Sequence, residues 1–282
     1  MAEQFRRVAI VGLGLKGGSL AMVLRKKRIA KEVVGIDTNK TILTKAVHRD
    51  IVDRAVAELA EGIPQADLVV IAVPTYTAPD VLASVAPHLK AGTIVCEVGR
   101  LKGPILEKAD EILTDANPFV GCHPVVYMEE KDIDEAYPAL FQNRPCILTL
   151  GRRRDEEAVK RLREMWETAG CKVEEMDPEV HDRLFSVLED LPVLLIRLIR
   201  KAAGQVSRYV DEVEDYFSRE LKEITKIDDT ISALVTERIW ANRKSIVHVL
   251  AYYRLKLKEL SDVLQEGSLE ELKALLQPGY RT

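Results

Sequence analysis

A glycine-rich segment directly after a short apolar run is the feature that most limits the folds open to this chain. The run is Arg7–Val11, and the segment Gly12–Gly17 matches the pattern G-x-G-x-x-G. The run predicts a buried parallel strand, and Gly17–Arg25 predicts a helix. Asp37 ends the next predicted strand, Glu32–Ile36, about 20 residues further along. This order is typical of the first half of a dinucleotide-binding domain.

Each part of the glycine-rich segment has a physical role. Gly12 permits a tight turn, and Gly14 lets the backbone approach a pyrophosphate. Gly17 allows the helix to pack closely on the strand. The free N–H groups at the start of the helix are expected to face the phosphates, which makes Leu15 and Lys16 candidate cofactor contacts.

The acidic residue after the second strand bears on which cofactor is used. Asp37 is expected to bind the ribose hydroxyls and to repel a 2′-phosphate, which predicts NAD over NADP. Val73 and Pro74 end a later strand at the same edge of the sheet, so they and Thr75 are candidate contacts; an ordinary strand end is the alternative for Thr75. For the whole pattern, the alternative is a glycine-rich turn in another doubly wound fold, such as one that binds S-adenosylmethionine.

Strands and helices continue to alternate up to residue 176. Further strands are predicted at Asp67–Val73, Gly92–Cys96, Phe119–Cys122, Cys146–Leu150 and Lys172–Met176, with helices at Pro79–Leu89 and Asp155–Ala169. Such alternation predicts an α/β fold, a Rossmann-type doubly wound parallel sheet with helices on both faces. We therefore expect residues 1–176 to form a nucleotide-binding domain.

The pattern changes after Asp177, where no convincing strand follows. Glu179–Ala203 has apolar residues at helical spacing, and Pro192 is expected to kink this helix. Ile227–Gln265 predicts one or two long helices, and Leu269–Leu276 a short one. Residues 177–282 are thus expected to form an all-helical domain.

Composition excludes several classes of protein. The 282 residues suit two domains, and 47% hydrophobic with 30% charged residues is typical of a soluble globular protein. A net charge of −4 gives no support for nucleic-acid binding, and the cluster Arg152–Arg154 is expected to lie in a solvated loop. No apolar run is long enough to cross a membrane, and no signal peptide is visible. The four cysteines form no CxxC pair or zinc-finger spacing, which predicts no metal and buried thiols in a reducing, cytoplasmic setting.

Two loops at the carboxyl edge of the predicted sheet carry polar residues. They are Glu97–Pro104 and Val120–Pro124, and loops at this edge hold the chemistry in open α/β sheets. Oxidation of an alcohol needs a base, for which histidine is suited because its pKa lies near neutrality. Of the five histidines, His123 is the candidate base; His181 begins a helix and is interpreted as structural.

Seven motifs resemble the prephenate/arogenate dehydrogenase family and follow its order along nearly the whole chain. They are Gly12–Leu20, Gly35–Lys40, Ala66–Pro74, Val98–Ile105, Gly121–Pro124, Asp177–Arg183 and Trp240–Arg243. The resemblance implies oxidation of a ring hydroxyl with loss of the ring carboxylate, a step of tyrosine biosynthesis. It implies that His123 takes the hydroxyl proton and that Lys102 sits near the nicotinamide and substrate. It also implies that the helical domain forms a homodimer and completes the pocket for a small-molecule substrate.

The chain departs from the family in the residues that would meet the substrate. Arg100 stands where the family usually has serine, and Glu189–Val193 replaces a Ser-His-Leu-Pro-His stretch. Lys226 stands at the position of an arginine that binds a substrate carboxylate, and the family's Asp-Pro and Trp that follow it are also missing. Lysine keeps the charge of that arginine but loses its bidentate fork.

The acidic replacements leave two interpretations open. Asp190 and Glu189 would add negative charge beside a dicarboxylate, which Arg100 would offset by pairing with Asp190 or by binding the substrate itself. An acidic pocket would instead suit a substrate with an ammonium group. Alternatively, both acids point to solvent.

Four hypotheses for the function follow. The retained phosphate loop, Lys102 and His123 favour an active prephenate- or arogenate-type dehydrogenase. The altered substrate residues favour a dehydrogenase of the same architecture with another substrate. A third hypothesis is a non-catalytic dinucleotide-binding protein, and the presence of His123 argues against it because such a protein needs no base. A β-hydroxyacid dehydrogenase shares the architecture, but Gly121–Pro124 and Trp240–Arg243 speak against it.

The apolar face of the last predicted long helix is relevant to the oligomeric state. This face suggests a homodimer, with an intramolecular core as the alternative. The residues of this face are Ile246, Val249, Leu250, Tyr253, Leu257, Leu260 and Leu264.

Overall fold

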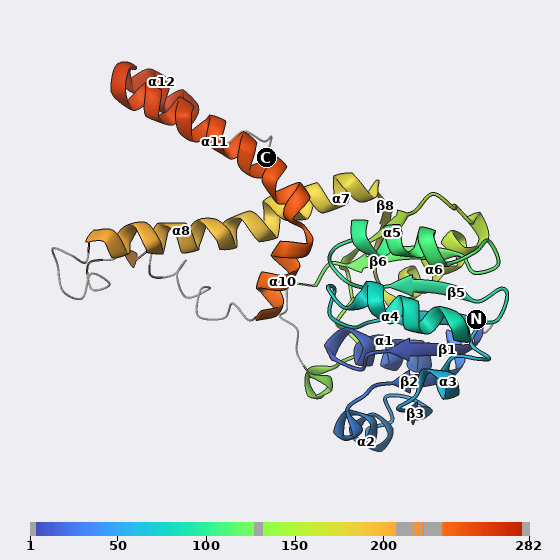
Figure 1. Ribbon diagram of the computed structural model, residues 1–282. Coiled ribbons are helices and arrows are strands. Elements are labelled where there is room, and N and C mark those ends of the chain that lie inside the picture. Colours follow the sequence, from blue (N-terminus) through green and yellow to red (C-terminus); the bar gives the residue numbers. More distant parts are fainter. Residues whose placement is uncertain are drawn as a thin grey trace. The chain divides into compact units, whose positions relative to one another are not determined.

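The chain divides into two compact units in a computed structural model that describes residues 4–126, 132–206, 216, 218, 219, 222 and 233–277. The units are Met1–Asp182 and Arg183–Thr282 (Figure 1). The division falls later than the predicted one at residue 176, because His181 and Asp182 form hydrogen bonds within the first unit.

The described part of the first unit contains one sheet of eight strands in the order β3-β2-β1-β4-β5-β6-β7-β8. The strands are β1 Phe5–Val11, β2 Ala30–Ile36, β3 Arg54–Val56, β4 Leu68–Ile71, β5 Ile94–Glu97, β6 Phe119–Pro124, β7 Pro145–Leu150 and β8 Lys172–Glu175. The pairings from β3 to β6 are parallel, as predicted. The strand order reverses between β1 and β4, and in such sheets ligands bind beside that point.

The sheet differs from the prediction at β7, which runs antiparallel to β6. Strand β7 therefore begins at the end of the sheet at which β6 finishes. The antiparallel ladder pairs His123 with Ile147 and Pro124 with Cys146. For this reason β6 continues two residues beyond its predicted end at Cys122, and His123 lies within the strand.

Helices cover both faces of the sheet. They are α1 Leu15–Lys26, α2 Lys40–His48, α3 Leu59–Gly62, α4 Ala78–Val85, α5 Gly103–Ile112 and α6 Glu156–Ala169, with 3-10 turns at Ala86–His88 and Ile133–Glu135. Helix α7, Pro178–Phe185, follows β8 and spans the boundary between the two units. The strand residues alternate between faces, so Val8 and Ile10 pack with α1 and α6. Ala9 and Val11 pack on the other face, where α4 and α5 lie side by side (Figure 1).

The cysteines and the helix ends of the first unit agree with local expectations. All four thiols are free and buried, as predicted. The Asp155 side chain accepts a hydrogen bond from the Ala158 N–H at the start of α6 (2.7 Å), and Gly170 ends that helix with a φ of +110°.

The helical unit begins with an irregular segment. A π-helical turn, Ser186–Asp190, precedes α8 Leu191–Val206, so the predicted helix is interrupted next to Pro192. Pro192 has no N–H to donate to the Leu188 carbonyl, and in a regular α-helix its ring would collide with that carbonyl, which favours the wider turn. The remaining described helices are α10 Ala233–Ala241, α11 Arg243–Glu266 and α12 Leu269–Leu275.

The predicted apolar face of α11 is only partly covered within a single chain. Ile246 and Val249 are buried, whereas Leu257 and Leu264 are 47% and 65% exposed. Among the described helices, none combines the length and apolar character that a membrane-spanning segment requires.

Candidate active site

The glycine-rich turn after β1 lies against the end of β4, where the strand order reverses. Gly12 has a φ of +95°, and a Cβ there would lie 2.8 Å from the carbonyl oxygen of Ala72. A Cβ on Gly17 would collide with the carbonyl oxygen of Gly12. Gly14 is the N-cap residue of α1 and provides no side chain to occupy the space above the helix end. This bare backbone cradle and the helix N-terminus fit a pyrophosphate.

Asp37, at the end of β2, has its carboxylate turned toward this cradle. Oδ2 accepts a hydrogen bond from the Leu13 N–H at 2.9 Å, and Oδ1 accepts one from the Asn39 N–H at 2.9 Å. The carboxylate is therefore held in one orientation beside the glycine-rich turn, as a ribose-binding acid requires.

The loop from β5 to α5 is fixed by hydrogen bonds along its length. The Glu97 carboxylate accepts a hydrogen bond from the Gly99 N–H, and the Thr75 hydroxyl accepts one from the Arg100 N–H at 3.1 Å. The ammonium of Lys16 donates to the Val98 carbonyl at 3.2 Å and thus links the start of α1 to this loop. The predicted contacts Thr75, Lys16 and Arg100 therefore belong to one connected region of the carboxyl edge.

The Lys102 side chain is completely buried beneath this loop. Its ammonium is 2.6 Å from Oε2 of Glu97, which is also buried, and donates to the Cys122 carbonyl at 2.9 Å. The ion pair joins the end of β5 to β6, one residue before His123. The Lys102 side chain, which the resemblance implies lies near the nicotinamide, thus links the end of β5 to β6.

His123 lies near the end of β6 and is almost fully buried. Its Nδ1 is 2.9 Å from Nε2 of His181, and the two rings meet edge to face with centroids 5.1 Å apart. His181 lies on α7 with no exposed surface. His181, interpreted from the sequence as structural, is the hydrogen-bond partner of the candidate base.

Asp182 completes the chain of hydrogen bonds. Its Oδ1 is 2.8 Å from Nδ1 of His181 and accepts a hydrogen bond from the Lys102 N–H at 2.9 Å. Its Oδ2 accepts one from the Gly103 N–H at 2.7 Å. One carboxylate therefore caps the N-terminus of α5 and also orients His181.

The acceptors in this chain determine the proton positions. Asp182 accepts hydrogen bonds from two backbone N–H groups, and as the acceptor beside Nδ1 of His181 it places the proton of that ring on Nδ1. Nε2 of His181 then accepts from Nδ1–H of His123, which leaves the lone pair on Nε2 of His123. A neutral imidazole with this tautomer is suited to take a proton.

The surroundings keep His123 neutral. Burial lowers the pKa of His123 well below its usual range, and the positive charges of Lys16, Lys102 and Arg100 lower it further. Burial also lowers the pKa of His181, against the opposing effect of its hydrogen bond to Asp182.

Several features of this arrangement were missed at the level of sequence. His181, Asp182 and Glu97 were not assigned to the site, although the adjacent His-Asp pair after Asp177 is a signal for an oriented imidazole. The 58 residues between His123 and His181 hid their contact, whereas Glu97 lies only five residues before Lys102.

The helical unit contains the predicted substrate residue Asp190. It is buried, and its Oδ1 forms an ion pair with Nη2 of Arg238 at 3.0 Å. Its Oδ2 accepts a hydrogen bond from Nδ2 of Asn242 at 3.0 Å. The alternative that Asp190 points to solvent is therefore wrong, because the side chain is buried and paired with Arg238. The predicted substrate residue Lys226 lies outside the described residues.

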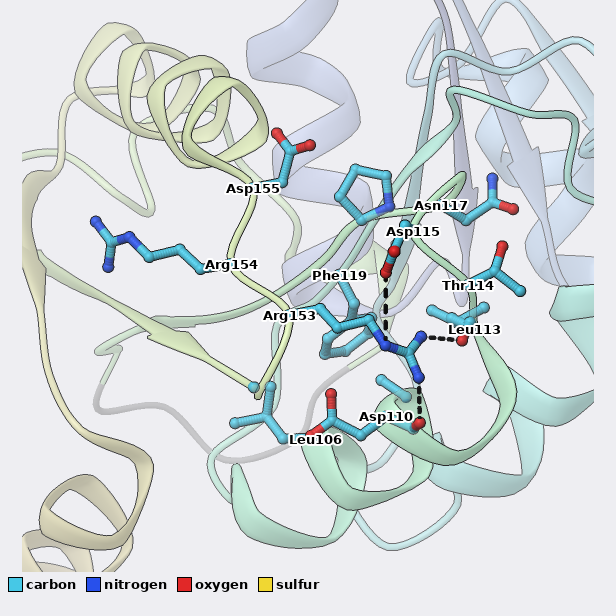
Figure 2. A pocket seen from close by; sticks show the side chains of 13 residues that line it. Leu106, Asp110, Leu113, Thr114, Asp115, Asn117, Phe119, Arg153, Arg154 and Asp155 are labelled. Carbon is cyan, nitrogen blue, oxygen red and sulfur yellow. Dashed lines mark hydrogen bonds and ion pairs between the residues drawn. The ribbon is translucent and has the colours of Figure 1, made fainter.

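A cavity of about 90 Å³ lies elsewhere in the first unit, near the C-terminal end of α5 (Figure 2). Figure 2 shows Arg153 pointing toward that helix end, where its guanidinium donates to the carbonyls of Asp110, at 2.6 Å, and Leu113. Arg153 thus caps the end of this helix and is not only part of a solvated loop. None of the candidate catalytic groups lines this cavity.

Among the described residues, no group of three or more His, Cys, Asp or Glu side chains is arranged to hold a metal.

Comparisons with known proteins agree with this geometry. Residues 20–175 match the nucleotide-binding domain of prephenate dehydrogenase, and residues 177–278 match its dimerization domain. The cyclohexadienyl dehydrogenase of Zymomonas mobilis is 26% identical over 95% of this chain and 93% of its own length.

Two solved structures are similar over nearly the whole chain. One is prephenate dehydrogenase from A. aeolicus with hydroxyphenyl propionate and NAD+, at 25% identity, a TM-score of 0.87 and coverage of 96% of this chain and 94% of that one. The other is Synechocystis arogenate dehydrogenase, at 28% identity, a TM-score of 0.85 and coverage of 96% of both chains. With both of its domains matched in order, this chain belongs to the prephenate dehydrogenase family.

Proposed function

We propose that this protein uses NAD to oxidise the ring hydroxyl of prephenate or arogenate, with loss of the ring carboxylate as CO₂ and formation of a 4-hydroxyphenyl product. The observation that carries the proposal is the chain of hydrogen bonds that runs from Asp182 through His181 to His123. The family match and the relatives that act on cyclohexadienyl compounds support the substrate class.

The residues of the glycine-rich turn are proposed to hold the cofactor. Asp37 would bind the ribose hydroxyls, and the cradle would receive the pyrophosphate; its proposed contacts are Gly12, Gly14, Leu15, Lys16, Gly17, Val73, Pro74 and Thr75. The A. aeolicus relative was solved with NAD+, which supports this choice of cofactor. When bound, NAD accepts the hydride from the carbinol carbon.

His123 is proposed to take the proton of the substrate hydroxyl on Nε2. As the proton arrives, the imidazolium is stabilised through His181 by the negative charge of Asp182. The Glu97–Lys102 pair keeps β6 in place, so that Nε2 remains directed at the hydroxyl. Arg100 and Lys226 are proposed to face the carboxylates of the substrate.

A homodimer formed through the helical unit is also proposed. The match of residues 177–278 to a dimerization domain supports it, as do the exposed apolar side chains of α11, such as Leu264. Burial of these side chains against a second copy would remove them from water.

The test is formation of NADH by the purified full chain with NAD and either prephenate or arogenate. Turnover with one of them, lost in His123→Asn, is the expected result. No turnover with either substrate, in a protein that still binds NADH, would overturn the proposal and favour a different substrate.

A further inference from the structure

Lys16 connects the glycine-rich turn to the loop that follows β5. It is the second residue of α1, after the N-cap residue Gly14 and Leu15. Its backbone N–H is one of the first four of the helix, which point along the helix axis toward the proposed phosphate position. Its side chain extends to the neighbouring loop, where the ammonium donates to the Val98 carbonyl at 3.2 Å. A single residue therefore belongs both to the cofactor cradle and to the loop.

A lysine at this position is unfavourable for its own helix. The N-terminus of a helix carries a partial positive charge, and the first turn of α1 has no acidic residue to offset an added cation. The residue is also only half-buried, so it contributes little to the packing of α1 on the sheet. What favours the lysine must come from outside the helix, and the contact with Val98 is such an interaction.

The loop that Lys16 contacts leads to two of the charged groups near the candidate base, Arg100 and Lys102. Its backbone is held from the side of β4, because the Val98 N–H donates to a carbonyl at the end of that strand at 3.0 Å. The Arg100 N–H donates to the Thr75 hydroxyl at 3.1 Å. Lys16 adds a contact from the side of the cofactor cradle, at the Val98 carbonyl.

The charge of Lys16 also acts on the base itself. Burial is the main cause that lowers the pKa of His123, and the positive charge of Lys16 lowers it more than those of Lys102 and Arg100 do. His181, which faces His123 from α7 at 2.9 Å, contributes to the same lowering. The ammonium of Lys16 therefore lies close to the base as well as to the loop, and all of these groups belong to the first unit.

We infer that Lys16 is a positioning residue that couples the cofactor site to the base. Its ammonium holds the loop Val98–Lys102 beside His123, and holds it more firmly when a dinucleotide occupies the N-terminus of α1. The inference rests on the proposed cofactor site and does not depend on which substrate is oxidised. It gives the side chain of Lys16 a role separate from the backbone contact with the cofactor.

Hydrogen–deuterium exchange, followed by mass spectrometry, tests the coupling without any substrate. The measured peptide covers residues 98–102 in the full chain, without NADH and with saturating NADH. Lys16→Met removes the ammonium and keeps an unbranched side chain, whereas Lys16→Arg keeps a cationic donor. Lys26→Met makes the same change at an exposed position in the last turn of α1 and serves as the matched control. Exchange in β1 shows that each variant is folded.

We expect NADH to slow exchange of this loop about tenfold in the wild-type chain, as a strengthened hydrogen bond to a charged group would do. In Lys16→Met this protection should fall to about twofold or less. The affinity for NADH should change by less than about threefold, because the backbone N–H groups of the cradle remain. Lys16→Arg should keep part of the protection, and Lys26→Met all of it.

Full protection of the loop in Lys16→Met overturns the inference, and so does a loop that NADH leaves unprotected in the wild-type chain. Much weaker NADH binding in Lys16→Met, with full protection once the protein is saturated, would show that the ammonium is a phosphate ligand, which also overturns it. The proposed function fails separately, if the coupling is present but the wild-type chain oxidises neither prephenate nor arogenate.

Discussion

His123 and His181 share a hydrogen bond of 2.9 Å between Nδ1 of the first ring and Nε2 of the second, although 58 residues separate them. The bond assigns the proton of His123 to Nδ1 and leaves Nε2 as the acceptor. It places the candidate base at the end of a chain that begins at the Asp182 carboxylate.

Replacement of His123 tests the base directly. His123→Asn retains a polar side chain but has no group that takes a proton near neutral pH. We expect kcat to fall by about 10²- to 10⁴-fold, with NADH affinity unchanged because the residue is outside the glycine-rich turn. A kcat close to wild type would contradict the assignment of the base.

Replacement of Asp182 tests the positioning chain. Asp182→Asn leaves one acceptor oxygen for three groups, the N–H groups of Lys102 and Gly103 and the His181 ring, and removes the carboxylate charge that would stabilise the imidazolium. We expect kcat to fall by about 10- to 10³-fold, within the range attributed to general base catalysis, with little change in KM. Equal losses in kcat for Asp177→Asn, which alters a neighbouring helix cap, would show that the effect is only structural.

The activity should persist below the usual titration range of histidine. Because burial and neighbouring cations lower the pKa of His123, the imidazole stays neutral as the pH falls. Removing a cation weakens this effect and raises the pKa. Arg100→Ser should therefore move the acidic limb of the kcat/KM profile to higher pH, and an unchanged or lower limb would contradict this explanation.

The buried pair of Glu97 and Lys102 should matter for stability. Lys102→Met leaves an unpaired buried carboxylate, and we expect a loss of about 3–5 kcal/mol in the free energy of unfolding. The double variant Glu97→Gln/Lys102→Met removes both charges and should recover a large part of it. Chemical denaturation measures both, and a double variant as unstable as the single one would refute the pairing argument.

The close approach at Gly17 should be essential for cofactor binding. Gly17→Ala places a methyl group against the carbonyl of Gly12, so α1 must shift and distort the cradle. We expect NADH affinity to fall by about tenfold or more, since a shift of this size removes at least one hydrogen bond to a charged group. Gly204→Ala, on α8 with open space around the added methyl group, is the matched control and should bind NADH as the wild type does.

Local order along the chain was enough to predict the nucleotide-binding half. This half begins with an apolar strand, a glycine-rich turn, a helix and an acid after the next strand. These elements follow closely in the sequence, so short-range geometry is enough to bring Gly12, Gly17 and Asp37 together, as expected. His123 was also predicted, because a residue near the carboxyl end of a parallel strand reaches the same edge of the sheet.

The tertiary structure alone decided which groups act on these residues. The antiparallel return of β7, the contact of His181 with His123, and the ion pair between Asp190 and Arg238 each join segments far apart in the sequence. Such contacts depend on the path of long connections and on which buried charges find partners, and neither leaves a periodic pattern in the sequence. The sequence therefore determined the fold class, the glycine-rich turn and the candidate base, while the folded chain determined the hydrogen-bond partners of that residue and the charges around it.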